Sequence, residues 1–453
     1  MTLRRVWLAA GAAFALAASG AVAQDRLTTA SVPTTPIAGD FTFAAVGDLI
    51  YLRPMRATLE AQSPELARLL RAADVTFGNF ETSAFDLATT RAVPQAESGG
   101  TWMLAEPGVP KDLAGLGFDV VAHANNHATD WGVEGMVETH RLLTEAGLVW
   151  AGTGVSMGAA RAPRYLDTSK GRIAIVSSTS TFPAMARASD PLGEVPGRGG
   201  ANTIRTTRTA LVTPAERESL RALAARSPLR GDAPNADGVT LMGDRYAVGG
   251  RETGKLSFSY RMNARDLEGN LRAIRQAKQN GNFVIYSVHN HEPGNDIQEP
   301  ADFATELARQ AIDAGADAYM GHGPHQLRGI EIYKGRPIFY SLGNFAMMNN
   351  SLDAAPADMF DQYGVEPGSA TVPELLAARN ARSFADPVNF ESVVAITRYR
   401  DGVLAEIRLY PIDLGVDRTG AAKGVPFMAD RSRARAILER LQRLSAQLGT
   451  RIT

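Results

Sequence analysis

The chain of 453 residues contains no cysteine and only seven histidines. Without cysteine it can form no disulfide bond, hold no metal through a thiolate and use no thiol as a nucleophile. Stability must therefore come from a hydrophobic core. Any chemistry must come from histidine, aspartate, glutamate and asparagine, so the positions of the few histidines are informative.

The chain also lacks an excess of either charge, because 47 lysines and arginines stand against 48 aspartates and glutamates. Proteins that bind polyanions usually carry a basic field, so we expect no nucleic-acid partner. Hydrophobic residues make up 45% of the chain and charged residues 21%, which is typical of a soluble globular protein. No segment beyond the N-terminus reaches transmembrane length.

The first 23 residues are predicted to be a secretory signal peptide. Two arginines precede an apolar run that ends in the small-residue sequence Ala-Val-Ala at 21–23. An uncleaved membrane anchor is the alternative, but the run is short for a bilayer span. We therefore expect a mature chain that begins at Gln24, is periplasmic or secreted, and starts with a flexible Thr- and Pro-rich linker over 24–40.

Beyond the linker, short apolar runs of strand length alternate with amphipathic helical patterns, which predicts an α/β domain over 41–412. Two further pairs of β-rich runs flank the turns "KGRP" and "RDG", so we expect added antiparallel hairpins and mixed sheets. The expected strands lie at 41–46, 74–77, 118–123, 172–178, 283–288 and 317–320.

Two regions differ from this pattern. Residues 183–255 are rich in glycine, arginine and proline with little periodicity, which indicates an insertion or a lid. Residues 413–453 form a C-terminal tail with one predicted helix. Its apolar stripe favours docking onto the domain over a membrane-surface or partner helix, and consists of Ile437, Leu441, Leu444 and Leu448.

Polar residues follow five of the expected strands. Because loops beyond the carboxyl ends of strands form the ligand crevice of α/β sheets, these residues should converge. Imidazole, carboxylate and amide groups together suit a divalent ion such as Mn, Zn or Fe, and we expect one or two. The residues are Asp48, Asn79, Glu81, Asn126, His127, His289, His322 and His325.

Two other histidines are expected to have no part in this site. His123 lies at the end of an apolar run and is interpreted as a hydrogen-bonded loop histidine, and His140 is interpreted as a helix-surface histidine. The chain has no phosphate-binding loop that ends in Lys-Ser or Lys-Thr, which argues against nucleotide-driven chemistry. Metal-assisted hydrolysis or transfer is a simple route to catalysis without cysteine.

Five segments resemble, in order and spacing, the bacterial capsule-synthesis protein CapA family. That family is associated with poly-gamma-glutamate synthesis and is related to the calcineurin-like metallophosphatases. The resemblance implies a four-layer α/β/β/α sandwich of the metallophosphatase type with mixed β-sheets. The segments are "AAVGDLIYLRPM", "GNFETS", "GFDVVAHANNHATDWG", "SVHNHEP" and "GHGPHQLRGIEIYKGRPIFYSLGNF".

The resemblance also implies roles for single residues. His127 would stabilise or protonate the reacting group, and Asn79 would bind substrate. Arg53, five residues after Asp48, is a candidate for gripping an anionic substrate. His291 could supply a further metal ligand. The implied metal ligands are Asp48, Glu81, Asn126, His289, His322 and His325.

The expected function is that of an exported metal-dependent hydrolase or transferase. Its substrate would be a cell-envelope polymer such as poly-gamma-glutamate, or a phosphoester. The alternative is a non-catalytic accessory factor in the synthesis, export or anchoring of a poly-gamma-glutamate capsule, in contact with the capsule-synthesis machinery. A plain phosphatase or nucleotidase rests on superfamily analogy alone.

Overall fold

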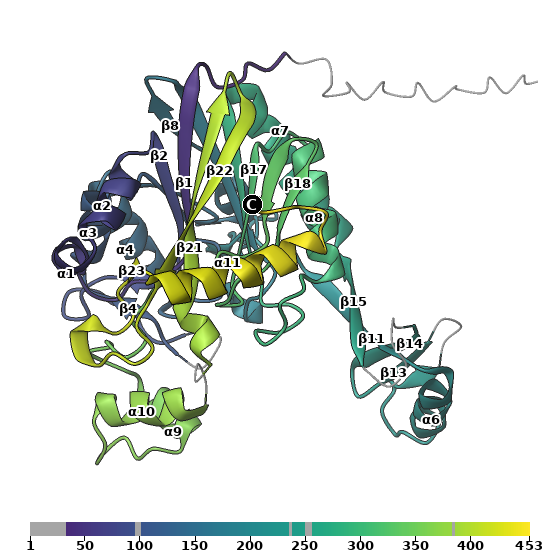
Figure 1. The fold of residues 1–453 in the computed structure, drawn as a ribbon. Coiled ribbons are helices and arrows are strands. Elements are labelled where there is room, and N and C mark those ends of the chain that lie inside the picture. The colour runs from purple at the N-terminus through teal and green to yellow at the C-terminus, as the bar shows by residue number, and fades with distance from the viewer. Residues whose placement is uncertain (1–32, 96–100, 235–237, 250–255, 383–385) are drawn as a thin grey trace, which may run out of the picture. The chain divides into compact units, whose positions relative to one another are not determined.

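A computed structural model describes residues 33–95, 101–234, 238–249, 256–382 and 386–453. The predicted signal peptide and most of the linker lie outside the described residues, so the leader and the domain boundaries stay predictions. Thr34–Thr453 form one structural unit, in which helices flank two large sheets (Figure 1).

Each of the six apolar runs that were expected to form a strand does so. The side chains in the middle of these strands are buried on both faces, as is typical of strands that are covered by other layers on both sides. The strands are β1 (Asp40–Ile50), β2 (Val75–Phe80), β5 (Val120–Ala122), β9 (Gly171–Thr179), β16 (Phe283–His289) and β17 (Ala318–His322).

Both predicted hairpins are confirmed. The turn Asp401-Gly402 has φ angles of 49° and 76°, and two successive positive φ angles are the signature of the tight turn that matches strand twist. The hairpins are β18 (Ile330–Tyr333) with β19 (Arg336–Phe339), and β21 (Glu391–Arg400) with β22 (Val403–Asp413).

The strands assemble into two sheets, and each sheet combines parallel and antiparallel neighbours. The prediction of mixed sheets is therefore confirmed. The first sheet has the order β23 (Phe427–Met428), β22, β21, β1, β2, β5, β6 (Val149–Ala151), with β20 (Asn344–Met347) also paired to β1. The second has the order β18, β19, β17, β16, β9, β8 (Arg164–Thr168).

The two sheets face each other across one core, and helices cover the outer face of each. On β16, Phe283 and Ile285 lie in the core between the sheets, whereas Val284 and Tyr286 pack under helices. This period of two makes both faces of the strand apolar. The expected four-layer α/β/β/α sandwich is confirmed. Its outer helices are α1 (Arg56–Gln62), α2 (Pro64–Arg71), α3 (Val109–Gly115) and α4 (Gly132–Glu145) on the first sheet, and α7 (Ala264–Asn280) and α8 (Asp302–Asp313) on the second.

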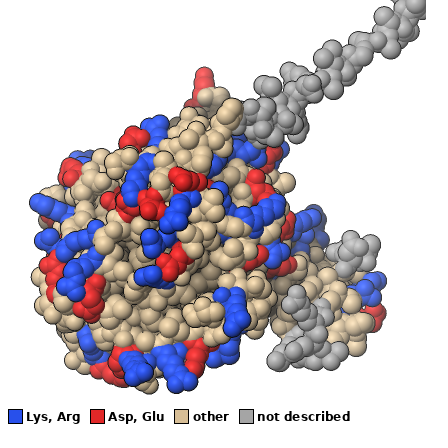
Figure 2. Space-filling view, turned by 45° about the horizontal axis from the view of Figure 1, so that its top comes forward, with Lys and Arg blue, Asp and Glu red and all other residues tan. Residues whose placement is uncertain are grey.

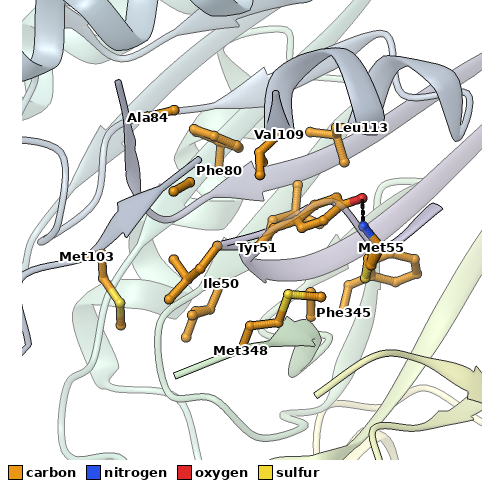
Figure 3. Packing of buried hydrophobic residues seen from close by; sticks show 14 of the residues in the cluster. Ile50, Tyr51, Met55, Phe80, Ala84, Met103, Val109, Leu113, Phe345 and Met348 are labelled. Carbon is orange, nitrogen blue, oxygen red and sulfur yellow. Dashed lines mark hydrogen bonds between the residues drawn. The ribbon is translucent and has the colours of Figure 1, made fainter. Parts of the chain in front are cut away.

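Tyr51 lies in the middle of the core between the first sheet and its helices (Figure 3). Its hydroxyl accepts a hydrogen bond from the backbone N–H of Met55 at 3.1 Å and donates one to Asp112 on α3. The Asp112 carboxylate also accepts from the N–H groups of Met55 and Arg56, both at 2.9 Å. One carboxylate thus satisfies the free N–H groups at the start of α1 and ties α1 to α3.

The region predicted to be an insertion or lid contains much of a small five-stranded sheet. Its function as a lid stays a prediction. The strands of this sheet are β11 (Thr206–Val212), β12 (Ala233–Pro234), β13 (Gly238–Leu241), β14 (Asp244–Val248) and β15 (Ser257–Met262), and helix α6 (Pro214–Ala224) follows β11. The remaining short elements are β3 (Ser83–Ala84), β4 (Leu104–Ala105), β7 (Thr153–Gly154), β10 (Gly200–Ala201), α5 (Met157–Arg161), α9 (Ala357–Tyr363), α10 (Val372–Arg382), η2 (Ala184–Ala186), η3 (Pro387–Phe390) and η4 (Gly420–Ala422).

The C-terminal helix α11 (Arg431–Ala446) runs across one edge of the sandwich (Figure 1). Ile437 and Leu441 are buried in the core between the sheets, so the predicted docking of the apolar stripe is confirmed. Ser445 accepts a hydrogen bond from the backbone N–H of Ile330 on β18, at 3.0 Å. The helix therefore contacts the second sheet as well as the first.

Glu391, at the start of β21, holds α11 to the first sheet. Its carboxylate binds Arg433 at 3.1 Å and also binds Arg440. Glu391→Ala should lower the free energy of unfolding by about 3 kcal/mol, because two arginines lose their shared, largely buried partner. Denaturant unfolding measures this. Glu439→Ala removes an exposed helix pair with Arg435 and should leave the midpoint almost unchanged. Equal midpoints for both variants would contradict the assigned role of Glu391.

Lysines and arginines are interspersed with aspartates and glutamates on the face shown in Figure 2. This mixture agrees with the near-zero formal charge of the sequence. Within the described part of the chain, no helix combines the length and the apolar character that a membrane crossing needs.

Candidate metal centre

The carboxyl ends of strands from both sheets meet at one place. Asp48 pairs in register with Asn79 across β1 and β2, and His289 pairs with His322 across β16 and β17. Because the two sheets face each other, these pairs approach across the end of the shared core. The convergence predicted from the strand ends therefore describes the geometry correctly for these four residues.

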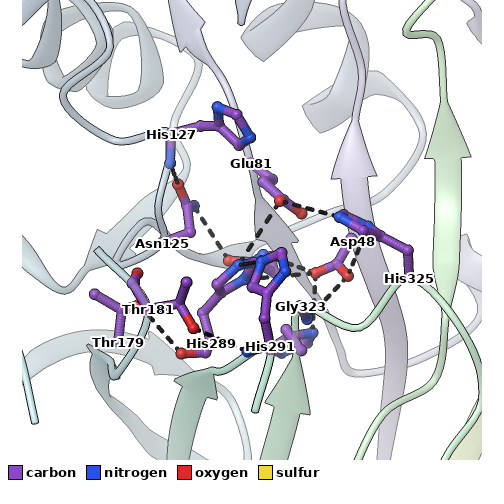
Figure 4. Close-up of polar contacts among 12 residues, drawn as sticks. Asp48, Glu81, Asn125, His127, Thr179, Thr181, His289, His291, Gly323 and His325 are labelled. Atoms are coloured by element: carbon purple, nitrogen blue, oxygen red, sulfur yellow. Dashed lines mark hydrogen bonds and ion pairs between the residues drawn. The ribbon is translucent and has the colours of Figure 1, made fainter. Parts of the chain in front are cut away.

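The carboxylates and imidazoles lie close together (Figure 4). His289 Nδ1 and His322 Nδ1 lie 3.9 and 3.7 Å from Asp48 Oδ1. His289 Nε2 and His325 Nε2 lie 3.7 and 3.9 Å from Glu81 Oε1. Such separations suit atoms that share a metal ion through bonds of about 2 Å.

Two groups of three residues could each hold a metal ion. One consists of Asp48, Glu81 and His289, and the other of Glu81, His291 and His325. In each group the potential ligand atoms lie within 4.8 Å of one another. Glu81 belongs to both groups, so its two carboxylate oxygens could serve two neighbouring ions.

Glycines allow the chain to approach closely around Asp48. A Cβ atom on Gly47 would lie 1.8 Å from the carbonyl oxygen of Gly343. Gly323 has a φ of 111°, and its backbone N–H donates to Asp48 Oδ2 at 3.1 Å. A side chain at position 47 would push β1 away from Gly343, and a Cβ atom on Gly323 would lie 2.7 Å from the carbonyl oxygen of Asn290.

Two histidines donate a ring N–H to an oxygen that orients the ring. His325 Nδ1 lies 2.9 Å from Asn344 Oδ1, and His127 Nδ1 lies 2.7 Å from Asp130 Oδ2. Because these oxygens accept from Nδ1, the Nε2 atom of each ring keeps its lone pair for a metal or a proton. Such outer partners are typical of metal-binding and acid–base histidines.

Burial acts in opposite directions on the two kinds of ligand. It raises the pKa of Asp48 to about 6, and burial together with the charge of Asp48 raises the pKa of Glu81 well above its usual range. Burial lowers the pKa of His322 to about 3 and that of His325 to about 4. The imidazoles are therefore neutral at physiological pH, the form in which they bind metals.

The residues present fit a divalent cation. No N–H group among the described residues donates to either oxygen of Glu81, and neither ring nitrogen of the buried His322 has a hydrogen-bond partner there. No Lys or Arg of the described chain forms an ion pair with Asp48 or Glu81. Buried carboxylates in this situation either stay protonated or are neutralised by a bound cation. Oxygen and imidazole donors together suit Mn, Zn or Fe.

Metal binding should release protons and should weaken as the pH falls below about 6. In the metal-free protein the raised pKa values keep Asp48 and Glu81 protonated on the acidic side, and a cation binds only their ionised forms. Affinity should therefore rise between about pH 5 and about pH 7. Calorimetry in two buffers of different ionisation enthalpy measures the released protons. An affinity that does not change over this range would contradict the pKa assignments.

The other predicted site residues lie in different surroundings. Asn79 donates from Nδ2 to Asp48 Oδ1 at 2.8 Å and lies 3.1 Å from His289 Nδ1, so it orients two ligands. Asn126 is buried beside His127, and its role as a ligand stays a prediction. Arg53 donates to Ser351 and to the carbonyl of Ala421, which ties two loops together. Its role in substrate binding, like that of Asn79, stays a prediction.

Sequence reasoning missed the residues that orient the site. Asn125 donates to the carbonyl of Phe80 at 2.8 Å and accepts from the N–H of His127, which joins β2 to the His127 turn. Asp130 also accepts from the N–H of Met103 at 2.8 Å. The spacing of Asp130, three residues after His127, is the signal that could have found it.

The two histidines that were set aside are both buried. His123 is hydrogen-bonded to Thr153 and Thr82, as expected for a loop histidine. The prediction that His140 lies on the helix surface is wrong. Its ring stacks on Trp150 with centroids 3.7 Å apart and its Nε2 lies 2.7 Å from Thr153 Oγ1, so α4 turns this face inward.

The role of one serine motif can be assigned only from the structure. Residues 154–158 read Gly-Val-Ser-Met-Gly, the pattern of a serine-hydrolase nucleophile turn. Ser156 instead begins α5, and its hydroxyl accepts from the N–H of Ala159 at 3.2 Å. No histidine of the described residues hydrogen-bonds this hydroxyl, so the motif here is a helix cap.

A four-layer α/β/β/α sandwich with mixed sheets, whose strand ends gather buried carboxylates and histidines, belongs to the metallophosphatase class of folds. Within that class, the chain belongs to the family described as bacterial capsule synthesis protein PGA_cap, whose sequence profile matches residues 42–349. The matched range contains every residue of both ligand groups.

Curated relatives extend this similarity. The uncharacterized protein y4sH of Sinorhizobium fredii is 47% identical over 438 residues, which cover 94% of this chain and 93% of that protein. The PGA biosynthesis protein CapA of Bacillus subtilis is 27% identical over 307 residues, 66% of this chain and 61% of its own length. A protein of Mycobacterium tuberculosis named as a probable polyglutamine synthesis accessory protein is 27% identical over 232 residues, 51% of this chain and 46% of its own.

Proposed function

We propose that this chain is an exported metal-dependent hydrolase, or a transferase of related chemistry. Its substrate is a cell-envelope polymer such as poly-gamma-glutamate, or a phosphoester. The observation that carries the proposal is the pair of ligand groups that share the buried Glu81. The basic and then apolar N-terminus supports export to the periplasm or beyond.

The proposal includes two divalent ions of Mn, Zn or Fe. Asp48, Glu81 and His289 would hold one, and Glu81, His291 and His325 the other. His322, beside Asp48, would complete the first set. Ions held in this way would polarise a phosphoryl or acyl oxygen and activate water.

His127 is the acid of the proposed reaction. Its Nδ1–H donates to Asp130, which leaves Nε2 to carry a proton to the leaving group. His127 is 4% exposed, so water has little access to this proton. Asp130 holds the ring in place, because its Oδ2 lies 2.7 Å from His127 Nδ1.

A non-catalytic accessory role is the second candidate. The accessory name of the Mycobacterium tuberculosis relative supports it. In this role the ions would grip the carboxylates of the polymer while the capsule-synthesis machinery extends or exports it. The same metal ligands would be needed, whereas the proton on His127 would not.

An activity screen on the mature chain separates the two candidates. The metal-loaded protein and its chelator-treated form are incubated with phosphoesters and with gamma-glutamyl oligomers, and the His127→Ala variant serves as the control. Turnover that needs both the metal and His127 supports the enzyme. Metal-dependent retention of the polymer without turnover, equal in the His127→Ala variant, supports the accessory role and rejects the enzyme.

A further inference from the structure

Arg328, in the segment after β17, is a fully buried cation with 0% exposure. Burial lowers its pKa to about 10, so it stays charged at neutral pH. No carboxylate of the described residues lies within ion-pair distance of its guanidinium. A buried charge without an ion-pair partner costs free energy, so the hydrogen bonds of the guanidinium must offset this cost.

All three hydrogen bonds of this guanidinium go to the loop 290–297, which follows β16. Nη1 donates to Asn290 Oδ1 at 3.3 Å, Nη2 to the carbonyl of Gly294 at 3.2 Å and Nε to the carbonyl of Ile297 at 3.3 Å. Gln326 donates to the carbonyl of Asn295 in the same loop. The segment that carries His325 therefore clamps the loop that carries His291.

Inside the clamped loop, Asn295 orients His291. Its Oδ1 lies 2.8 Å from His291 Nδ1, so the ring donates there and keeps the lone pair on Nε2. That Nε2 lies 2.9 Å from His289 Nε2, and the two rings lie next to each other in Figure 4. His325 is oriented by Asn344 in the same manner, at 2.9 Å.

We propose that Arg328 and Gln326 are positioning residues, which hold the loop 290–297 so that Asn295 presents His291 Nε2 to the second metal ion. This inference rests on the two-ion centre of the proposed function. Both histidines of the second ligand group then share one design, in which an asparagine oxygen lies against Nδ1. Partners of this kind typically change metal affinity by about 10- to 100-fold.

Metal stoichiometry tests the inference without reference to activity. The full mature chain is titrated with Co²⁺, and bound metal is followed by elemental analysis and by the visible spectrum of the ion. The wild type should bind two ions. Asn295→Ala and Arg328→Met should bind the first ion normally and the second about 10- to 100-fold more weakly. Asn295→Asp keeps an acceptor for His291 Nδ1 and should restore the second ion.

Arg336→Met is the matched control. This arginine lies at the opposite end of the second sheet, where it donates to the carbonyl of Gly402 at 3.0 Å. It should leave both ions in place. Asn295→Ala keeps the test valid if Arg328→Met fails to fold, because it removes only a small loop side chain.

The failures are distinguishable. A wild type that binds fewer than two ions overturns the two-ion centre and this inference with it. A wild type with two ions and an Asn295→Ala variant that also binds two with unchanged affinity overturns only the role of the loop. Loss of both ions in Asn295→Ala would show general damage and would also overturn it.

Discussion

Glu81→Gln should remove both metal ions from the centre, with each affinity falling by more than about 100-fold. Glu81 belongs to both ligand groups, and both of its oxygens are buried without an N–H donor among the described residues. An amide has the same shape as the carboxylate but only one oxygen and no charge. It therefore cannot bind two cations or neutralise them.

The same substitution should make the metal-free protein more stable. Asp48 and Glu81 are fully buried at the strand ends, and burial together with the charge of Asp48 raises the cost of ionising Glu81. Removing one of two neighbouring carboxyl groups relieves this cost when no cation is present. Thermal unfolding in chelator should show a higher midpoint for Glu81→Gln than for the wild type, and added metal should stabilise only the wild type.

Glu331→Gln is the matched control for this experiment. Glu331 is also a buried glutamate, but it lies on β18 and binds Arg309 and Tyr340. It should keep both ions and should destabilise the protein, because it loses an ion pair. If Glu81→Gln retained the metal content of the wild type, or if both variants changed alike, the shared-ligand geometry would be wrong.

The strands and the strand-end ligands could be predicted because both follow from local pattern. An apolar run such as 283–288 that is buried on both faces can only be a central strand, and His289 then falls at its carboxyl end. The register of β16 with β17 then places His289 beside His322. Chemistry at strand ends is thus encoded by positions along the chain.

Apart from Asp130, which lies three residues after His127, the orienting residues could not be predicted in this way, because their roles depend on distance in space. Asn344 lies 19 residues after His325 and reaches it only because β18 and β19 fold back between them. Arg328 looks like a surface arginine until the loop 290–297 closes over it. Polar residues of this kind are common in loops, and no spacing singles them out.

The regions outside the sandwich show a second limit of prediction from the sequence. Most side chains of strands β11, β14 and β15 are only partly buried or exposed, so the sequence lacks the alternation that reveals a half-buried strand. Their arginine and glycine content favoured loops instead. His140 was misplaced for a related reason: one histidine on an amphipathic helix does not show which face turns inward.

His127→Ala should lower turnover by roughly two to four powers of ten while both metal ions stay bound. His127 belongs to neither ligand group, and Figure 4 shows it next to Glu81, so it stands beside the centre rather than in it. Its Nδ1–H is committed to Asp130 at 2.7 Å, which leaves Nε2 as the atom that can deliver a proton. Removing the ring removes the proton and leaves the metal ligands in place.

A second variant, Asp130→Asn, tests the same role of His127 and should have a smaller effect. The asparagine can still accept from His127 Nδ1 and so keeps the ring in place, but its hydrogen bond is weaker than that of the carboxylate, so turnover should fall less than in His127→Ala. Metal content and turnover are measured on the same preparations. Full activity in His127→Ala would show that this histidine only supports the fold, whereas loss of metal would make it a ligand. Either result would mean that another group supplies the proton. That group would not be a histidine at the strand ends, because the proposal assigns the remaining ones to the metal ions.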